Sequence, residues 1–397
     1  MVDFVGEKFA FVVPGLLGHL YPCVPLIETL TARGHELHFF QRHSSDHATE
    51  LLRKYGTVLR ASEGNRQVGR GNTDLNSFES RVARFRSMLI TNELVLATRD
   101  FIRDVGPKAV IGDACLWDTA IAADMLKLPF IGVHTSIGAI APDRSECERR
   151  LITEELKAEY LELFAKYEAE VVDIRRFETV SKFLNIIWTV PEMLIEASDC
   201  PANTELVGVS LPKNKRGGQE ADWDALSDKP IVYVSFGTIY HARATLLEMI
   251  LRGLSTLDVN VVVATPALPE CFVDALPANC TWLKLSDQIA ALEHADAFVS
   301  HGGHSSFLEA IRIGVPVLVV PLASDQPNQA FFAEHHGIGR AIHPDVLEPE
   351  GVAKTIASML TDEKLKTMIK RFSELYKEGG GAETAVNRIE ERLAQLS

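Results

Sequence analysis

Short apolar runs alternate with longer segments of helical periodicity along most of the chain. In the first half, five runs are apolar on both faces and closed by Gly, Asp or Pro: "KFAFVV", "ELHFFQ", "TVLRA", "KAVIGD" and "PFIGVHT". Such runs are typical of strands buried on both faces of a parallel sheet. Residues 22–33 and about 75–105 have helical patterns, and a charged helical segment at about 146–176 predicts an inserted helical lobe.

The second half repeats this alternation. Its predicted strands are "PIVYVSFGT", "NVVVAT", "CTWLKLS", "AFVSHG" and "VPVLVVP". Its predicted helices cover residues 244–257, 288–294, 305–313 and 325–335. Strands that alternate with helices predict βαβ units around a mostly parallel sheet.

The length and one aperiodic stretch predict two domains. A chain of 397 residues is too long for one ordinary core. The segment "SLPKNKRGGQEADW" is rich in Lys, Gly and acidic residues and has no periodicity, which is typical of a linker. We therefore expect an α/β protein of two Rossmann-like, doubly wound domains that face a central cleft, with ligands at the carboxyl ends of the strands. The expected boundaries are 1–212 (with an insertion at about 142–176), a linker at 213–222, and 223–380.

Charge and cysteine usage exclude some classes of partner. The formal net charge of −14 argues against nucleic acid or an anionic membrane, so a phosphate-bearing ligand must be held by local donors. The six cysteines are scattered without a C-x-x-C pair, which is typical of buried thiols in a reducing compartment. The sequence shows neither a signal peptide nor an apolar run long enough to span a bilayer, and we expect a cytoplasmic protein.

The first candidate for chemistry is His19, in the loop "VVPGLLGHLYPC" after the first predicted strand. It lies just before a helix that we expect to begin near Pro22. The positive end of a helix dipole favours neutral imidazole, which is the form that a general base needs. The alternative is a loop histidine that only caps the turn.

The second candidate is Asp113, which closes the predicted strand "AVIGD". A carboxylate at this end of a strand faces the ligand crevice, where it could orient His19 and stabilise its protonated form. The alternative is a cap for the helix expected from Trp117. Asp118 and Asp124 are competing carboxylates, but both fall within that helix.

Two glycine-containing turns in the second half predict a phosphate site. Gly237 and Thr238 follow one strand, and backbone N–H groups with a hydroxyl could bind a phosphate there. After the strand "AFVS", His301 and the following glycines lead into the helix at 305–313. Its N-terminus offers further donors, together with the Ser306 hydroxyl.

Further polar residues are expected at the same edge of the predicted sheet as the phosphate site. Glu309 lies one turn into that helix and could reach ribose hydroxyls, and the strand "VPVLVVP" leads to Asp325 and Gln326, which could hold a hydroxylated group. His301 and His304 lack a third ligand with zinc geometry, so we expect no metal.

The stretch "HGGHSSFLEAIRIGVPVLVVPLASDQPNQA" resembles the donor-binding signature of the family 1 nucleotide-sugar glycosyltransferases, which have the two-domain GT-B fold. The family pattern is H-x-G-x-N-S-x-x-E, then G-V-P, then P-x-x-x-[DE]-Q-x-x-N. This chain matches it in order at His301, Gly303, Ser306, Glu309, residues 314–316, Pro321, Asp325 and Gln326, with Asn328 next to its final position. "DQIAALEHADAFVSHGG" and the N-terminal "GLLGHLYPCVPLIETLTARGH" are also similar to family segments.

This resemblance implies an inverting, metal-independent transfer of a hexose from a nucleotide sugar to a small apolar hydroxylated acceptor. In the family, a Gln at the end of the donor signature is associated with glucose, so the implied hexose is glucose. His19 would deprotonate the acceptor with help from Asp113. No cofactor is implied beyond the donor, and residues 381–397 would form a helix that packs back on the N-terminal domain. The implied donor-binding residues are Gly237, Thr238, Leu285, Gln288, His301, Gly303, His304, Ser305, Ser306, Glu309, Asp325 and Gln326.

Two positions depart from the family pattern. Ser305 replaces the usual Asn, and Leu285 replaces the aromatic residue that stacks on uracil, so the donor is UDP- or dTDP-linked. The acceptor stays open among phenolic, flavonoid, macrolide and other natural products. Two alternatives remain: a nucleotide-sugar 2-epimerase of similar fold, and a non-catalytic nucleotide-sugar-binding protein, which a large separation of His19 from Asp113 would favour.

Overall fold

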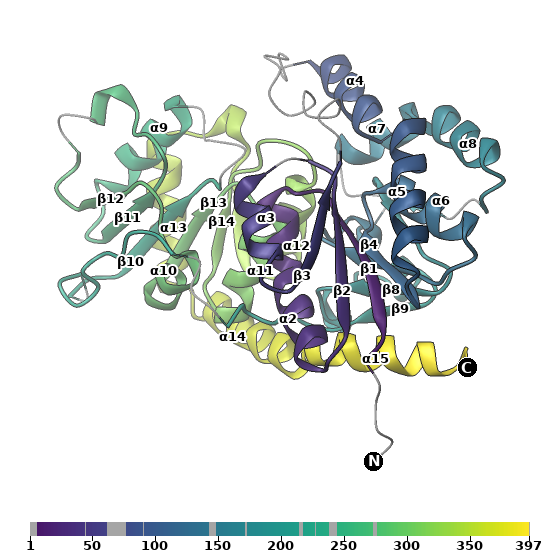
Figure 1. The fold of residues 1–397 in the computed structure, drawn as a ribbon. Helices are drawn as coiled ribbons and strands as arrows, with labels where there is room; N and C mark the ends of the chain where they lie inside the picture. The colour runs from purple at the N-terminus through teal and green to yellow at the C-terminus, as the bar shows by residue number, and fades with distance from the viewer. Residues whose placement is uncertain are drawn as a thin grey trace. The chain divides into compact units, whose positions relative to one another are not determined.

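The computed structural model describes residues 6–43, 45–61, 77–89, 91–142, 148–170, 173–213, 217–226, 228–237, 244–272 and 276–396. Three residues of the expected linker, 214–216, and Thr238 lie outside these ranges. The chain folds into two compact units, each built on its own sheet (Figure 1). The first comprises Met1–Pro142, Glu148–Val207 and Gly380–Ser397, and the second comprises Gly208–Gly379.

The first unit contains a seven-stranded sheet in which each neighbouring pair is parallel. The strand order is β3-β2-β1-β4-β5-β8-β9, so the direction of winding reverses between β1 and β4. The strands are β1 (Lys8–Val13), β2 (Glu36–Gln41), β3 (Gly56–Arg60), β4 (Ala109–Asp113), β5 (Phe130–His134), β8 (Leu184–Ile187) and β9 (Thr204–Leu206). In such sheets ligands bind at the carboxyl ends of the strands where the winding reverses.

Helices accompany these strands in the first unit. They are α1 (Leu17–Leu20), α2 (Val24–Ala32), α3 (Asp46–Leu52), α4 (Phe78–Leu89), α5 (Asn92–Val105), α6 (Trp117–Met125) and α15 (Ala382–Ala394). Helix α15 lies along α2, where the Arg33 guanidinium pairs with Glu383 at 2.7 Å and with Glu390 at 2.8 Å. The C-terminal segment is therefore an integral part of the first unit.

Two helix predictions need correction. The helix expected to begin near Pro22 begins at Leu17 as α1 and continues through a 3-10 turn (Tyr21–Cys23) into α2, so His19 lies inside the first turn. The pattern at 75–105 forms two helices, α4 and α5, because the Thr91 hydroxyl accepts a hydrogen bond from the Leu94 amide and caps a new helix.

The inserted segment is only partly helical. It forms α7 (Glu148–Glu155) and α8 (Lys157–Lys166), as the charged pattern predicts. It then forms an antiparallel hairpin of β6 (Ile174–Arg175) and β7 (Glu178–Thr179), which the sequence pattern does not predict. The hairpin packs against the core of the unit, since Glu178 and Thr179 are both fully buried.

The second unit contains a six-stranded parallel sheet in the order β12-β11-β10-β13-β14-β15. Its winding reverses between β10 and β13. The strands are β10 (Ile231–Ser235), β11 (Asn260–Ala264), β12 (Cys280–Leu283), β13 (Ala297–Ser300), β14 (Val317–Val319) and β15 (Gly339–Ala341). The helices are α9 (Ala244–Leu254), α10 (Gln288–His294), α11 (His304–Ile313), α12 (Gln326–His335), α13 (Pro349–Thr361) and α14 (Glu363–Glu378).

The two sheets confirm the expected fold class of two doubly wound α/β units. Among the described residues, no helix combines the length and the hydropathy that crossing a bilayer requires.

Candidate active site

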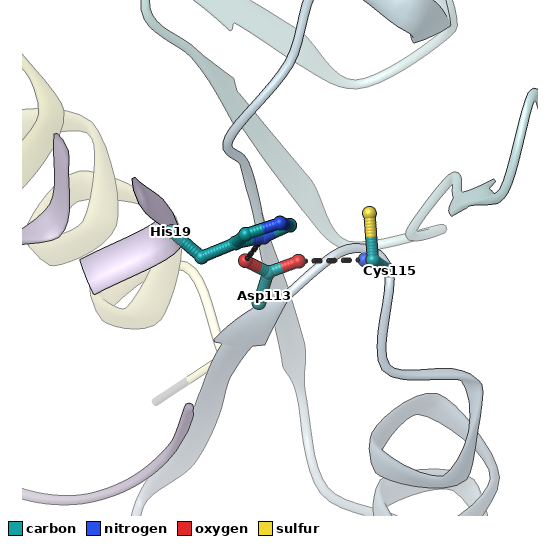
Figure 2. A group of neighbouring side chains, drawn as sticks. All are labelled: His19, Asp113 and Cys115. Carbon is teal, nitrogen blue, oxygen red and sulfur yellow. Dashed lines mark hydrogen bonds and ion pairs between the residues drawn. The ribbon is translucent and has the colours of Figure 1, made fainter. Parts of the chain in front are cut away.

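The predicted pair is formed at the switch point of the first sheet. His19 follows β1 and Asp113 ends β4, and these are the neighbouring strands between which the winding reverses. The Nδ1 atom of His19 lies 2.8 Å from Oδ2 of Asp113. Figure 2 shows the carboxylate between the imidazole of His19 and the backbone of Cys115, whose amide donates to Oδ1 at 2.8 Å.

A third side chain, Thr135, completes this group. It follows β5, the other neighbour of β4, and its Oγ1 lies 2.8 Å from His19 Nδ1 and donates to Asp113 Oδ2 at 2.8 Å. Sequence reasoning missed Thr135, although the signal was a polar residue directly after the apolar run "PFIGVH". The rule that selected Asp113 at the end of β4 applies equally to the end of β5.

These contacts fix the protonation pattern of the pair. Burial opposes ionisation of Asp113, but the charge and hydrogen bond of His19, the Cys115 amide and the Thr135 hydroxyl together hold the pKa of this carboxyl below its ordinary value. An ionised carboxylate accepts the proton on His19 Nδ1, and this tautomer leaves the imidazole lone pair on Nε2. The His19 side chain is 21% exposed and the Asp113 side chain 2%, so the carboxylate is buried behind the imidazole.

The contacts of Asp113, Asp118 and Asp124 distinguish the roles of the three aspartates. Helix α6 has Leu116 at its N-cap position and no side-chain cap, so Asp113 does not cap it. Asp118 forms a buried ion pair with Arg42 and accepts from the Thr98 hydroxyl at 2.6 Å. Asp124 accepts from the Glu170 amide at the surface.

The surroundings of His19 include a thiol and a second histidine. The ligand atoms of His19, Asp113 and Cys115 all lie within 4.8 Å of one another, but Nδ1 and Oδ2 are hydrogen-bonded to each other. Burial, with the nearby positive charges of Arg42 and Arg84, lowers the pKa of His43 to about 4. His43 is therefore neutral near pH 7.

In the second unit, His301 lies at the equivalent switch point. It follows β13, and Gly237 follows β10, the neighbouring strand. A Cβ atom on Gly237 would lie 3.0 Å from the His301 ring, and one on Gly303 would lie 2.5 Å from its Nε2, so both glycines make room for the imidazole. Gly237 also has φ +68°, a conformation that glycine adopts without strain.

His301 is a buried imidazole with unused hydrogen-bonding capacity. Its Nδ1 has no hydrogen-bond partner among the described residues, and the residue is 8% exposed. Burial lowers its pKa to about 4, although the charge of Asp325 acts in the opposite direction. A neutral imidazole at this place could donate to an incoming anion.

Three of the predicted donor-binding residues form one cluster. Gln288, the first residue of α10, donates to Glu309 Oε2 at 2.6 Å and to Ser306 Oγ at 3.1 Å, both on α11. Glu309 is 5% exposed. The sequence predicted these three residues at one site, and the structure brings them together.

Asp325 and Gln326 lie at the start of α12, as predicted, but part of their bonding capacity is used within the protein. The Gln326 side-chain oxygen accepts from the Leu322 and Ala323 amides at 2.6 and 2.8 Å, which leaves its amide nitrogen as the group able to donate. Asp325 Oδ2 accepts from Gln329 at 3.0 Å. Gln329, fully buried, was not predicted.

The remaining predicted residues differ in exposure. His304 and Ser305 are the first two residues of α11, and His304 is buried. Leu285, after β12, is 57% exposed, and its carbonyl accepts from the Gln219 amide at 2.7 Å. Thr238, also predicted, lies outside the described residues.

Comparisons with known proteins find relatives of this chain. A family model for UDP-glucoronosyl and UDP-glucosyl transferases matches residues 154–380. The chain is 25% identical over 388 residues to the NDP-glycosyltransferase YjiC of Bacillus subtilis (strain 168), covering 94% of each protein.

Solved structures share the whole fold. The glycotransferase of kitacinnamycin superposes with a TM-score of 0.80 at 20% identity, over 98% of this chain and 99% of that one. The glycosyltransferase VinC in complex with dTDP superposes with a TM-score of 0.72 at 18% identity, over 98% and 100%. The two units thus have the GT-B fold.

Proposed function

Because the chain belongs to the UDP-glucoronosyl and UDP-glucosyl transferase family, we propose that it transfers glucose from a nucleoside-diphosphate donor to a hydroxyl group of a small apolar natural product. The transfer inverts the anomeric centre and uses no metal ion. The observation that carries this proposal is the hydrogen bond of 2.8 Å between His19 and Asp113 at the switch point of the first sheet.

His19 acts as the general base. Its Nε2 takes the proton of the acceptor hydroxyl while the oxygen attacks the anomeric carbon of the sugar. The bond from that carbon to the diphosphate oxygen breaks, and its electron pair leaves with the nucleoside diphosphate. A base in this position contributes roughly 10²- to 10⁴-fold to the rate.

Asp113 holds the base and stabilises the imidazolium that forms. Its carboxylate is kept ionised by His19, Cys115 and Thr135. Its negative charge therefore stabilises the positive charge that develops on the His19 ring. A non-catalytic binder has no need of such a pair, and an epimerase has no acceptor to deprotonate. The short His19–Asp113 distance therefore supports transfer over both alternatives.

The diphosphate binds to the second unit. His301 Nδ1 is a buried donor without a partner among the described residues, beside Gly237 and the N-terminus of α11, a helix of ten residues. Backbone amides at a helix N-terminus attract phosphate oxygens. These donors supply the local positive potential that the net charge of −14 does not.

The hexose and ribose hydroxyls bind to two groups of side chains in the same unit, one around Glu309 and the other around Asp325. We assign Glu309, which is aligned by Gln288, to the ribose. We assign Asp325 and the Gln326 amide nitrogen to the hexose. The Gln329 side chain fixes the Asp325 carboxylate, and two backbone amides fix the Gln326 side chain. Preorganised groups of this kind favour one arrangement of hydroxyls over another.

UDP-glucose is the donor to test first, and dTDP-glucose is the second. The family supports uridine, whereas the exposed Leu285 offers no aromatic ring for uracil and the VinC structure contains dTDP. Both nucleotides present the same diphosphate to His301, so the base and the ribose 2′-hydroxyl, which dTDP lacks, distinguish them.

The test is nucleoside-diphosphate release on mixing the protein with either donor and a panel of flavonoid, phenolic, macrolide and sterol acceptors. Release that depends on the acceptor and gives a β-glycoside would support the proposal and identify the acceptor class. Binding of either donor without release across the panel would favour the binding-only alternative. Conversion of the donor without acceptor to its 2-epimer would favour the epimerase.

A further inference from the structure

The hairpin β6–β7 makes hydrogen bonds to both strand ends that carry the catalytic group. Thr179 donates through its amide and its hydroxyl to the carbonyl of Ala114, the residue after Asp113, at 2.8 and 2.9 Å. Glu178 accepts from the end of β5: from His134 Nδ1 at 3.1 Å and from the Ser136 hydroxyl at 2.6 Å. Thr135 lies between these last two residues.

Glu178 and His134 form an ion pair that is closed to solvent, since both side chains are 0% exposed. The Asn185 amide donates to three backbone carbonyls, so its oxygen must accept from His134 Nε2, 3.3 Å away. His134 Nδ1, the Ser136 hydroxyl and the Ala139 amide all face the Glu178 carboxylate, with the amide at 2.9 Å. Both ring nitrogens therefore have a partner, and the buried ring is held in one orientation against the carboxylate.

The turn of the hairpin adopts an unfavourable backbone. Arg176 has φ 46° and Phe177 has φ 77°, two consecutive left-handed residues without a glycine. Such residues are strained and persist where their surroundings hold them. Here the Arg176 guanidinium donates to two carbonyls, and the carbonyl of buried Phe177 accepts from the Trp117 indole at 2.7 Å.

We propose that this hairpin positions the catalytic group, and that Glu178 is a positioning residue which, through its ion pair with His134, holds Thr135 and Asp113 against His19. Successive residues of a strand point to opposite faces. Locking His134 on one face therefore fixes Thr135 on the other, where its hydroxyl meets both His19 and Asp113. An apolar pair would stabilise a core as well as a buried ion pair does. The ion pair and its hydrogen bonds also fix the orientation of the His134 ring. The kinetic part of this inference rests on the proposed function.

The test compares Glu178→Ala with Glu178→Gln, which keeps the hydrogen-bonding shape. We expect kcat to fall roughly 10- to 100-fold in the alanine variant, as for a misplacement of about 1 Å. KM should change little, and the glutamine variant should recover most of the loss. In a His19→Ala background the Glu178→Ala change should have little further effect, because Glu178 acts through His19. Equal losses in both backgrounds would mean general destabilisation and would overturn the proposal.

A spectroscopic measurement decides the positioning independently of activity. In ¹⁵N-histidine-labelled protein, the His19 signals, identified by their loss in His19→Ala, should show one tautomer with the proton on Nδ1. Glu178→Ala should give an average of two tautomers; an unchanged His19 signal would overturn the proposal. If the wild type transfers no sugar, the proposed function fails, while this spectrum still decides the role of Glu178.

Two further variants keep the test decisive. Glu178→Met combined with His134→Leu removes both charges together, so it should fold even where Glu178→Ala does not. It should show the same loss of kcat and the same averaged His19 tautomer; wild-type values in this folded protein would refute the proposal. The matched control is Glu390→Gln, which removes the carboxylate from His35, 3.1 Å away, just before the amino end of β2. We expect it to leave kcat and the His19 tautomer unchanged.

Discussion

The imidazole of His19 and the carboxylate of Asp113 are hydrogen-bonded at 2.8 Å although they lie 94 positions apart in the chain. The fold alone accounts for this, because β1 and β4 are neighbours with their carboxyl ends at one edge of the sheet. His19, in the helix that follows β1, therefore lies at the same edge of the sheet as Asp113, the last residue of β4. The pair is a property of the topology, and its chemistry follows from burial and hydrogen bonding.

Replacing His19 by Ala should remove transfer without removing donor binding. We expect the rate to fall by roughly 10²- to 10⁴-fold, the usual contribution of a general base. The affinity for the nucleoside diphosphate, measured by calorimetry, should stay within about twofold because the donor residues belong to the other unit. A rate equal to that of the wild type would exclude His19 from the mechanism.

Replacing Asp113 by Asn should lower the rate by a similar factor, up to about 10⁴-fold. The Asn amide can donate to Nδ1, which moves the imidazole proton to Nε2 and removes the base. Steady-state kinetics at saturating donor would show this as a loss in kcat. A loss confined to KM of the acceptor would indicate instead that Asp113 only shapes the pocket.

Asp118 and Asp124 of α6 offer a test of stability that is separate from catalysis. Asp118→Asn leaves the buried Arg42 guanidinium without its carboxylate, and we expect a loss of about 3–5 kcal/mol in the free energy of unfolding. Asp124→Asn, on the same helix but at the surface, should cost less than about 1 kcal/mol. Denaturant unfolding of the two variants measures the difference, and equal costs would contradict the assignment of the buried ion pair.

Much of the fold could be predicted because buried parallel strands have a strong pattern. The apolar runs that become β1, β4 and β13 are long enough to stand out, and α10 covers 288–294, as its periodicity predicts. The hairpin β6–β7 could not be predicted in this way. Each strand has two residues, too few for alternation, and its turn uses Arg176 and Phe177 where Gly or Asn would give a signal.

The site was predicted where one residue at a strand end carries the chemistry, and missed where the fold supplies a supporting contact. His19, Asp113 and His301 each follow or end an apolar run. Thr135 becomes visible only when β5 is known to lie beside β4. Gln329 lies inside α12, and only the helical turn back to Asp325 gives it a role.

Acid should destabilise the protein through His301. Its pKa of about 4 in the fold lies below the ordinary value of 6.5, so below pH 6.5 the unfolded chain binds a proton that the native chain does not. The fold therefore loses stability as the pH falls from 6.5 to 4, by about 1.4 kcal/mol per unit and about 3 kcal/mol in total. His301→Gln, unfolded by denaturant at pH 7 and pH 4.5, should lose less than the wild type. Equal losses would show that His301 is protonated at the same pH in both states.

Gln326 provides the sharpest test of the sugar site, because its oxygen and nitrogen have different tasks. The oxygen accepts from the Leu322 and Ala323 amides and so holds the loop before α12. Gln326→Glu keeps an acceptor for these amides and removes the donor, whereas Gln326→Ala removes both. If the nitrogen donates to a hexose hydroxyl, the glutamate variant should bind the sugar donor roughly 2- to 12-fold more weakly, the worth of one hydrogen bond. Its affinity for the free nucleoside diphosphate should be unchanged, and the alanine variant should lose affinity for both ligands. A glutamate variant that binds the sugar donor as the wild type does would confine Gln326 to holding the loop and leave Asp325 as the hexose contact.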